Sequence, residues 1–514
     1  MAKMSVEEIL KRWKKADAHK EHWRDIYSEA YEYALPNRNL YDHYDTSSPG
    51  SNKRERLYDS TAENSTKKFA NKLQSTLFPP YRNWCRLEPG TRFPAESRPQ
   101  IQQVLDLYLQ EMFNVFKQSN FDLALGEFFL DLAVGTGVMC IEKGGPLEPI
   151  RFTAVPPFLC SFEEGPHNTI ENVYRRIRMR PELIQRQYPE AKLDAKLEEL
   201  IRDKPEEKVG LLEATIYDPV KGEYCFHVIF PDTQHLLLVR YHNTSPWVVA
   251  RFTKAPGEIL GRGPMLSALA DAKSLNKAKE FLLKNASLAI APIFTARDDG
   301  VLNPETISIA PGSVIPVASN GGPQGPSLTP LGRGGDVQLS QLVLADLQQS
   351  IKKELLDEGL PRDDMSARTA LEISSRLSDL AQNLGAAFGR LTAELMVPIV
   401  RRTMSVMDEL GLIELPIIID GLTIKVVPVS PLAQAQNKDE IQNVLQAFQI
   451  AQGLGPEGQM AFRTESVVDF VARKLGVPTE LMTTPEERMQ MQMMAAQAAA
   501  QQQQAMGEQE NAPT

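Results

Sequence analysis

The sequence is poor in the residues that build disulfide frameworks, metal sites and membrane spans. Its 514 residues include four cysteines, none of them in a CxxC pair: Cys85, Cys140, Cys160 and Cys225. This pattern predicts reduced, small apolar side chains rather than disulfides or a zinc site. No apolar run is long enough to cross a bilayer, and the first residues lack the apolar core of a signal peptide. We therefore expect no contact with a membrane and a cytoplasmic fold.

Sequence motifs of common enzymes are also missing. The chain has no GxxxxGK[ST] phosphate loop, no HExxH motif and no GxSxG nucleophile elbow. Cys225 and three histidines (His227, His235 and His242) lie close together in the sequence, but their separations fit no common metal-ligand spacing, so a structural role is favoured. We therefore predict that the protein is not an enzyme and carries no cofactor, no metal and no catalytic residues.

Acidic residues outnumber basic ones, 66 to 56, which gives a formal net charge of −10. Tight unspecific binding to nucleic acid depends on neutralising phosphates, so this balance argues against it. It does not argue against a surface that nucleic acid must slide past. The hydrophobic content of 42% and charged content of 24% are typical of a soluble globular protein, and the length allows several domains.

The most informative stretch runs from Gly263 to Asp357, where two helical patterns flank a Pro/Gly-rich segment. The first helix is predicted from Pro264 to Ile290, with proline at its first position, and would be about 40 Å long. The second is predicted from Val337 to Leu356. Each has a narrow apolar side, formed by Leu266, Leu269, Leu275, Leu282 and Ala289 in the first and by Leu344, Leu347, Ile351 and Leu355 in the second. These are struts rather than ordinary core helices.

The segment between the struts, Ala291 to Asp336, holds two short β-like runs, Ile293 to Thr295 and Ser313 to Val317, among Pro, Gly and Ser. A loop of this length in a compact domain is usually functional or disordered. It is either a flexible insertion or a small module carried on two helices.

The N-terminal part is predicted to be helical. Ser5 and Glu8 form a capping-box pattern that begins a helix running to about Leu35. Three further helices are expected at about 54–78, 101–118 and 121–134. Gly135 and Gly137 follow the last of these and are favoured as a helix C-cap that leads into a strand, since no further glycine completes a dinucleotide fingerprint.

From 138 to 252 the pattern changes to strands. They are expected at 138–142, 150–155, 173–179, 211–217, 224–230, 234–241 and 247–252, with helices at 181–187 and near 191–202, which predicts an α+β domain with a largely antiparallel sheet. Alternation places Tyr174, Arg176, Arg178 and Arg180 on one face. That face is a candidate phosphate-binding strip, but a solvated or subunit-facing strand is favoured.

After the second strut, a polar loop from Asp357 to Ser366 contains Gly359 and Pro361. Thr369 then begins the most regular helix of the chain, which we expect to kink at Pro398 and end before Gly411. Further helices are predicted at 434–452, at 465–475 and from Thr484, the last rich in Gln, Ala and Met, and the residues from about 507 are expected to be disordered.

The order of these parts resembles the head-to-tail connector, or portal, proteins of short-tailed bacteriophages (podoviruses), over residues 5 to 475. Three stretches carry the resemblance: LYDSTAENSTKKFANKLQSTLFPP with NWCRLEP, the helix–module–helix region, and MSARTALEISSRLSDLAQNLGAAFGRLTAELMVPIVRR. None is a catalytic signature, so the specificity lies in their joint order.

The resemblance implies an α+β, mainly helical fold of the portal type, with wing, helical stem, small α/β clip and helical crown or barrel. The implied division is a wing (1–260), a stem helix (261–290), a clip (291–336), a second stem helix (337–356), a channel loop (357–368), a long kinked wing helix with a return strand (369–425), crown helices (426–484) and a barrel helix or disordered tail (485–514).

It also implies a ring, usually of twelve copies, at one vertex of the capsid, through which DNA is packaged and later ejected. The implied partners are further copies of the chain, double-stranded DNA, the terminase large subunit, the tail adaptor and the major capsid and scaffolding proteins, with internal core proteins as a further candidate. The implied location is the head–tail junction of the virion, and the host cytoplasm during assembly. Twelve struts about 10 Å apart would surround a bore of about 28 Å, which a duplex can pass.

Two sets of residues are candidates for contacts in such a ring. The channel or DNA-facing candidates are Lys273, Lys277, Glu280, Lys284, Asp357, Glu358, Arg362, Asp363, Asp364 and Arg368. The lysines are equally well explained by ion pairs between subunits. The clip candidates for docking terminase or adaptor are Arg297, Asp298, Asp299 and Arg333. Two alternatives stay open: a non-viral helical ring-forming scaffold, and, less favoured, a packaging-associated enzyme such as a nuclease or ATPase.

Overall fold

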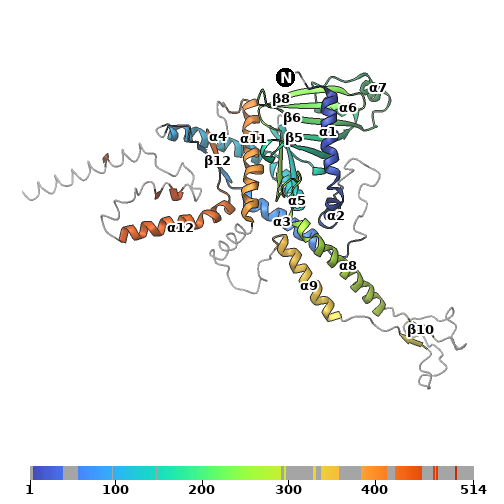
Figure 1. The fold of residues 1–514 in the computed structure, drawn as a ribbon. Helices are drawn as coiled ribbons and strands as arrows, with labels where there is room; N and C mark the ends of the chain where they lie inside the picture. Colours follow the sequence, from blue (N-terminus) through green and yellow to red (C-terminus); the bar gives the residue numbers. More distant parts are fainter. Residues whose placement is uncertain are drawn as a thin grey trace, which may run out of the picture. The chain divides into compact units, whose positions relative to one another are not determined.

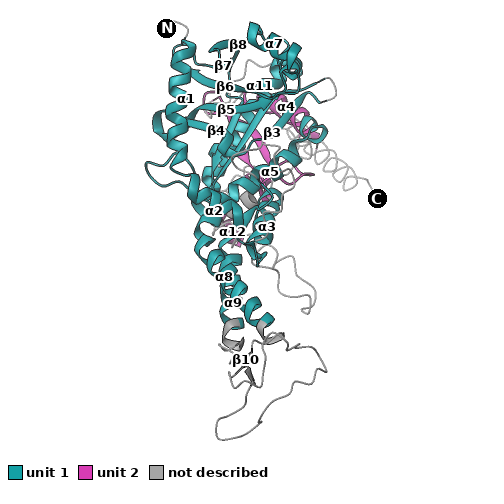
Figure 2. Ribbon diagram, turned by 90° about the vertical axis from the view of Figure 1, so that its right-hand side faces the viewer, with its two compact units in different colours: residues 1–75, 114–368, 384–414 teal, residues 76–113, 369–383, 415–514 magenta. Residues whose placement is uncertain are grey.

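The computed structural model describes residues 4–38, 56–94, 97–145, 148–290, 294–296, 328–330, 337–357, 384–413 and 423–453, with a few single residues between 467 and 494. They form a mixed fold of helices and sheets in two compact units (Figure 1, Figure 2). Unit 1 comprises residues 1–75, 114–368 and 384–414, and unit 2 comprises residues 76–113, 369–383 and 415–514.

Unit 1 begins with two helices, α1 (Val6–Glu21) and α2 (Arg24–Ala34), where the sequence predicted one. The predicted cap is confirmed, because the Ser5 hydroxyl accepts a 3.2 Å hydrogen bond from the Glu8 amide. The single helix is wrong because its two halves pack on different surfaces. Ile9 of α1 lies against the five-stranded sheet, whereas Tyr27 of α2 belongs to the core around α8.

The helix α5 (Phe121–Val134) leads directly into β2 (Thr136–Lys143), and Gly135 is its C-cap, as predicted. β2 is the central strand of a three-stranded antiparallel sheet with β3 (Ile150–Ala154) and β9 (Trp247–Arg251) at its sides. A Cβ at Gly135 would lie 2.2 Å from the carbonyl oxygen of Gly261, so only glycine fits where these segments meet.

A second sheet has five antiparallel strands in sequence order: β4 (Cys160–Glu164), β5 (Ile170–Met179), β6 (Val209–Asp218), β7 (Glu223–Phe230) and β8 (His235–His242). The predicted antiparallel arrangement is confirmed. α1 covers one face, and α6 (Pro181–Gln187) and α7 (Ala195–Asp203) cover the other. β4 was not predicted, because it is short, follows two prolines and is buried at its first three residues, so it lacks an alternating pattern.

The two struts are present as α8 (Pro264–Ile290) and α9 (Val337–Glu354), and both lie in unit 1. Between them the structure describes one antiparallel pair, β10 (Phe294–Ala296) with β11 (Leu328–Pro330). β10 confirms the first predicted β-like run to within a residue, and the second, Ser313 to Val317, lies outside the described residues.

The helix expected from Thr369 is described from residue 384. It runs through 384–391, a π-helical turn η4 (Thr392–Met396) and α11 (Val397–Glu409), and it ends before Gly411, which has a φ of +68°. A π turn therefore ends two residues before Pro398, and the kink at this proline stays a prediction.

α3 (Thr61–Leu77) begins later than the predicted Arg54, because the Asp59 carboxylate accepts the Thr61 amide at 2.7 Å and caps the helix there. In unit 2, β1 (Cys85–Pro89) pairs with β12 (Ile424–Pro428), which begins at the end of the range 369–425 in which a return strand was expected and continues beyond it. The remaining helices are α4 (Arg98–Gln118), which begins in unit 2, and α12 (Pro431–Gly453). All four cysteines are free.

Candidate functional site

The candidate site is the two-helix arm, defined as α8 and α9, which lie side by side in both ribbon views (Figure 1, Figure 2). The half of the arm next to the sheets is buried: Leu269 and Leu275 of α8 and Ile351 of α9 belong to one core cluster with Tyr27 of α2. We call this half the root. In the distal half, Phe281 is 53% exposed and Leu342 is 67% exposed. Of the predicted apolar side chains, Leu269, Leu275, Ile351 and Leu355 belong to this cluster, and Leu266, Leu344 and Leu347 pack against it.

The segment before α3 clamps the root. The Asn276 side chain accepts the backbone amides of Tyr58 and Asp59 at 2.7 and 3.2 Å and donates to the Arg56 carbonyl at 2.9 Å. Its three bonds hold an extended piece of chain against α8. A buried side chain that satisfies backbone groups in this way fixes the position of both segments.

Asp59 joins both helices of the arm to this clamp. Its carboxylate accepts Lys279 of α8 at 2.8 Å and Gln348 of α9 at 3.2 Å. Burial acts to raise the pKa of Asp59, but the hydrogen bonds from Lys279 and Thr61 outweigh burial, so the pKa lies below its ordinary value. Asp59 is therefore ionised at neutral pH and forms an ion pair with the partly exposed Lys279.

The root of the arm is also tied to the sheet by close backbone contacts. The Tyr27 hydroxyl donates to the Gly261 carbonyl, the Gly261 amide donates to Thr136 at 2.8 Å, and the Gly263 amide donates to the Val134 carbonyl at 2.8 Å. A Cβ at Gly263 would lie 2.2 Å from the Ala133 carbonyl oxygen. These glycines let the chain pass against the end of α5 immediately before α8 begins.

The C-terminal end of α9, which lies at the root, is fixed to α3. The Asp357 carboxylate, 8% exposed as a residue, accepts the Ser65 hydroxyl at 2.8 Å and lies 3.0 Å from the Lys68 ammonium. Lys72 donates to the Leu356 carbonyl at 2.9 Å, and Leu356 has a φ of +54°, which is unusual for leucine. Asp357 was a DNA-facing candidate, but its carboxylate is buried and bonded within the chain, so we keep it only as an anchor.

The other channel candidates of the arm are already in ion pairs within the chain. Lys273 lies 2.7 Å from Glu29 of α2, and Glu280 is flanked by Lys277 at 2.8 Å and Lys284 at 2.6 Å. The three lysines are about half exposed. Hydrogen bonds from Lys277 and Lys284 lower the pKa of Glu280. The four residues lie along one helix, as their spacing predicts, and whether they face DNA stays a prediction.

The remaining candidates lie outside the described residues. These are Glu358, Arg362, Asp363, Asp364 and Arg368 in the predicted channel loop, and Arg297, Asp298, Asp299 and Arg333 in the predicted clip.

The arginine strip on β5 is divided among different environments. Tyr174 is buried, whereas Arg176 lies over the Trp13 ring at 6.0 Å and Arg180 pairs with Glu206 at 2.7 Å. The favoured interpretation, a solvated or subunit-facing strand, therefore fits Arg180, which pairs with an acidic neighbour, but not Tyr174 or Arg176, which pack within the protein.

The histidines next to Cys225 do not converge on a site. His227 is buried on β7 with its Nδ1 3.4 Å from the Ala214 carbonyl, and burial lowers its pKa. His242 lies 3.9 Å from Glu409. Within the described ranges no group of three or more His, Cys, Asp or Glu side chains could hold a metal ion, and no helix is long and apolar enough to cross a membrane.

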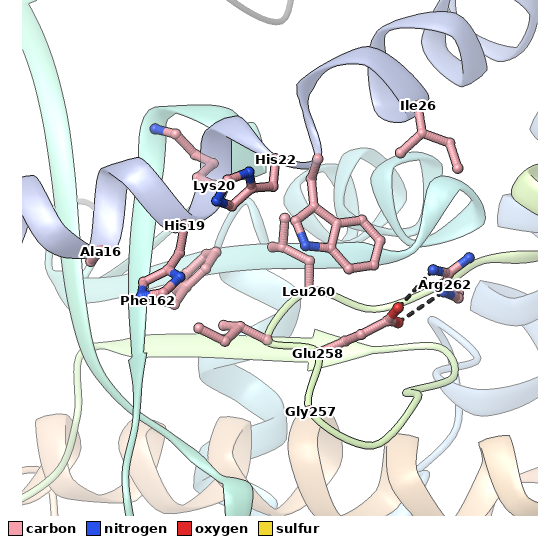
Figure 3. A pocket seen from close by; sticks show the side chains of 12 residues that line it. Ala16, His19, Lys20, His22, Ile26, Phe162, Gly257, Glu258, Leu260 and Arg262 are labelled. Carbon is pink, nitrogen blue, oxygen red and sulfur yellow. Dashed lines mark hydrogen bonds and ion pairs between the residues drawn. The ribbon is translucent and has the colours of Figure 1, made fainter.

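A pocket of about 510 Å³ lies beside the root, where α1 ends and α2 begins (Figure 3). Its walls include His19, His22, Phe162 and the loop Gly257 to Arg262. Arg262 is held by the Glu258 carboxylate at 2.6 Å, as the figure shows, and lies over the Trp23 ring at 5.2 Å. Lys20 is paired with Asp17 at 2.6 Å. Since both permanent cations of the pocket already have carboxylate partners, its charge does not select a ligand.

With this arrangement established, comparison with known proteins identifies the family. A model described as bacteriophage head to tail connecting protein matches residues 6–482, so the chain belongs to that family. A protein of Bordetella phage BPP-1 described as "Probable portal protein" is 23% identical over 502 residues, covering 92% of this chain and 88% of the relative.

Two solved structures are also similar. One is the virion of a native gene transfer agent particle, with 11% identity and a TM-score of 0.38 over 88% of this chain and 93% of that chain. The other is the neck of an empty gene transfer agent particle, with 14% identity and a TM-score of 0.34 over 82% of this chain and 90% of that chain.

Sequence reasoning missed the clamp residues Asp59 and Asn276 and the pairing of Glu394 with Arg251 described below. For Asp59 a partial signal existed, because Asp59 and Ser60 are both residue types that favour helix N-termini. Asn276 lies in a regular helical pattern and has no distinguishing signal, since its partner is 217 residues away in the sequence.

Proposed function

We propose that this head-to-tail connecting protein is a portal protein, which forms a ring at one capsid vertex around a channel for viral DNA. The family assignment over residues 6–482 is the observation that carries this proposal. The arm supports it, since its root is fixed within the chain while its distal half exposes large apolar side chains such as Phe281 and Leu342. Such side chains are expected where another copy packs.

The ring is proposed to have wing, stem, clip and crown regions as the resemblance divides them, with α8 and α9 as the stem. Twelve copies about 10 Å apart at the helix axes leave a bore of about 28 Å. With a net charge of −10 per chain, the assembly carries a large negative charge, so DNA is repelled from the wall and slides rather than adheres. Lys277 and Lys284 weaken that repulsion along the arm.

Within this ring, residues 358–368 are proposed to face DNA, and residues 297–299 with Arg333 to dock the terminase large subunit during packaging and the tail adaptor afterwards. The proposed location is the head–tail junction of the virion, reached from the host cytoplasm, with the major capsid and scaffolding proteins as further partners. In these roles the protein catalyses no reaction: it is a passage and a docking site for DNA and for other proteins, and not an enzyme.

Electron microscopy of the purified full-length protein tests the proposal. We expect closed rings with a central opening wide enough for a duplex, and an image average then gives the number of copies. Monomers, or oligomers without an opening, would refute the portal function. An ATPase assay on the same material is expected to give no activity above buffer, and sustained hydrolysis would instead favour a packaging enzyme.

A further inference from the structure

A buried group of charged side chains lies where β9 ends, close to the root of the arm. Arg251, only 2% exposed, is its centre. The Glu394 carboxylate accepts the backbone amide of Arg251 at 2.9 Å and its guanidinium at 3.2 Å (Nε) and 2.8 Å (Nη2). One carboxylate of the long helix 384–409 therefore holds both the backbone and the side chain of the last residue of β9.

Arg251 also reaches two other segments. It donates to the Glu164 carboxylate at 3.4 Å, to the Asn168 carbonyl at 3.0 Å and to the Ile259 carbonyl at 3.3 Å. Lys254 shares Glu164, so two cations and two carboxylates balance one another in the buried site. A single side chain thus connects the long helix, the turn between β4 and β5, and the loop that leads into α8.

A π turn puts Glu394 in this position. The Val397 amide donates to the Thr392 carbonyl, five residues back, and Pro398 has no N–H to offer the Glu394 carbonyl. A π turn amounts to one additional residue within an α-helix, and such turns are frequent at functional sites. Here it rotates Glu394 towards β9 while the helix continues beyond it.

The same helix is held a second time by Arg402. Arg402, 2% exposed, donates to the Ile141 carbonyl at 3.2 Å and to the Thr244 hydroxyl at 3.2 Å. Glu394 and Arg402 are eight residues apart, about 12 Å along a helix. Two attachments to one three-stranded sheet make the helix and the sheet move together.

The loop after Arg251 links the end of β9 to the start of α8. Thr253 and Arg262 bridge its two ends with backbone hydrogen bonds of 3.1 and 2.8 Å, and Gly263 is bonded to Val134 directly before Pro264 starts α8. From Ile259 to the first turn of α8 the chain is held closely, because Ile259, Gly261 and Gly263 are each bonded within unit 1.

We propose that Glu394 and Arg251 are positioning residues that transmit displacements of helix 384–409 to the root of α8. The inference rests on the proposed function, in which the residues before this helix face DNA and the arm leads to the clip. A shift of the helix moves Glu394, Arg251 follows because it is bonded at three atoms, and the loop carries the movement to the arm. The DNA-facing and docking ends of the protein are thereby coupled.

Hydrogen exchange on the full-length protein tests the connection itself. In Glu394→Ala we expect exchange across 251–268 to rise about tenfold, equivalent to about 1.4 kcal/mol in opening free energy, because Arg251 loses its carboxylate acceptor. Glu394→Gln keeps an acceptor and is expected to give a smaller rise.

Ala393→Gly, at an exposed neighbour in the same π turn, is the control and should raise exchange in 392–398 alone. Unchanged exchange at 251–268 in Glu394→Ala would overturn the proposal.

A second variant separates coupling from folding. Arg251→Met with Glu394→Met replaces the buried pair by apolar side chains, a change that proteins often tolerate. We expect rings like those of the wild type by electron microscopy, but about tenfold fewer DNA-filled heads when the variant complements a phage without its own copy. Intact rings with unchanged yields of filled heads would contradict coupling. Failure of the wild-type chain to form rings would instead contradict the portal function, and the exchange result would still stand.

Discussion

The two halves of the arm differ in how they are stabilised. At the root, glycines without room for a Cβ, the Asn276 and Asp59 clamp and the Tyr27 hydroxyl fix α8 with bonds supplied by the same chain. In the distal half, the side chains that the structure describes include surface ion pairs and half-exposed apolar groups. The contacts that stabilise the root all come from the same chain, whereas the distal half still exposes apolar side chains that another copy can cover. Substitutions should therefore unfold the protein at the root and only prevent assembly farther out.

The largest effect is expected at Gly263. Gly263→Ala would place a methyl group 2.2 Å from the Ala133 carbonyl oxygen, so the chain entering α8 must move. We expect a loss of about 3 kcal/mol or more in the free energy of unfolding, measured by denaturant titration. Gly389→Ala is the matched control, because no atom lies within 4 Å of its Cβ, and it should be neutral or slightly stabilising. Equal losses of unfolding free energy for the two substitutions would show that the close contact at Gly263 does not limit stability.

A smaller loss is expected at the clamp. Asn276→Ala leaves the amides of Tyr58 and Asp59 without their acceptor, which should cost about 2 kcal/mol in unfolding free energy. Asn285→Ala, on an exposed turn of the same helix, should change stability by less than about 0.5 kcal/mol. A near-neutral Asn276→Ala would show that the segment 56–59 is dispensable for the root.

The clamp also predicts a dependence on pH. The pKa of Asp59 is lower in the folded protein than in the unfolded chain, so the folded state favours the ionised form. Its contribution is fully present above the unfolded pKa, about 3.9, and is lost as the pH falls through the lower folded value. Thermal unfolding below pH 4 should therefore differ less between wild type and Asp59→Asn than at pH 7. A constant difference would argue against the ion pair with Lys279.

The distal half should respond in assembly rather than in stability. Phe281→Ser with Leu342→Ser removes two exposed apolar side chains, so the free energy of unfolding of the single chain should change by less than about 1 kcal/mol. We expect sedimentation velocity to show monomers where the wild type forms rings. Rings that persist would place the contacts between copies elsewhere on the chain.

The smallest effect is expected at Lys273. Its pair with Glu29 is exposed on both sides, and such pairs contribute little because water and salt screen them. Lys273→Met should leave the melting temperature and ring formation unchanged. A clear loss of rings would assign this lysine to a contact between subunits.

Regular patterns in the sequence predicted the regular parts of the fold. The apolar spacing located α8 and α9, and alternation located most strands of the five-stranded sheet. β4 was missed because a short strand between prolines and a turn has no period to detect. The break between α1 and α2 was missed because no proline or glycine marks it, and the surfaces on which the two helices pack decide it.

For the candidate site, the sequence predicted the two helices, but it did not predict the hydrogen bonds and ion pairs that their side chains form. Lys273, Lys277, Glu280 and Lys284 share a helix as expected, but Glu29, the partner of Lys273, is 244 residues away in the sequence. Asp357 seemed a free loop residue and is buried against α3, which no local pattern could indicate. Pro398 did indicate an irregular helix. The sequence could not show that the π turn brings Glu394 to Arg251, because that contact depends on where β9 ends in space.

The burial of three of the four cysteines makes it possible to label each chain with a single dye. Burial raises the pKa of Cys160 to about 12 and also raises the pKa values of Cys85, Cys140 and Cys225. Cys225 differs from the other three in being partly accessible on β7. A maleimide dye at neutral pH should therefore attach once per chain. Counting photobleaching steps on single particles would then read out the copy number of the assembly without any image reconstruction.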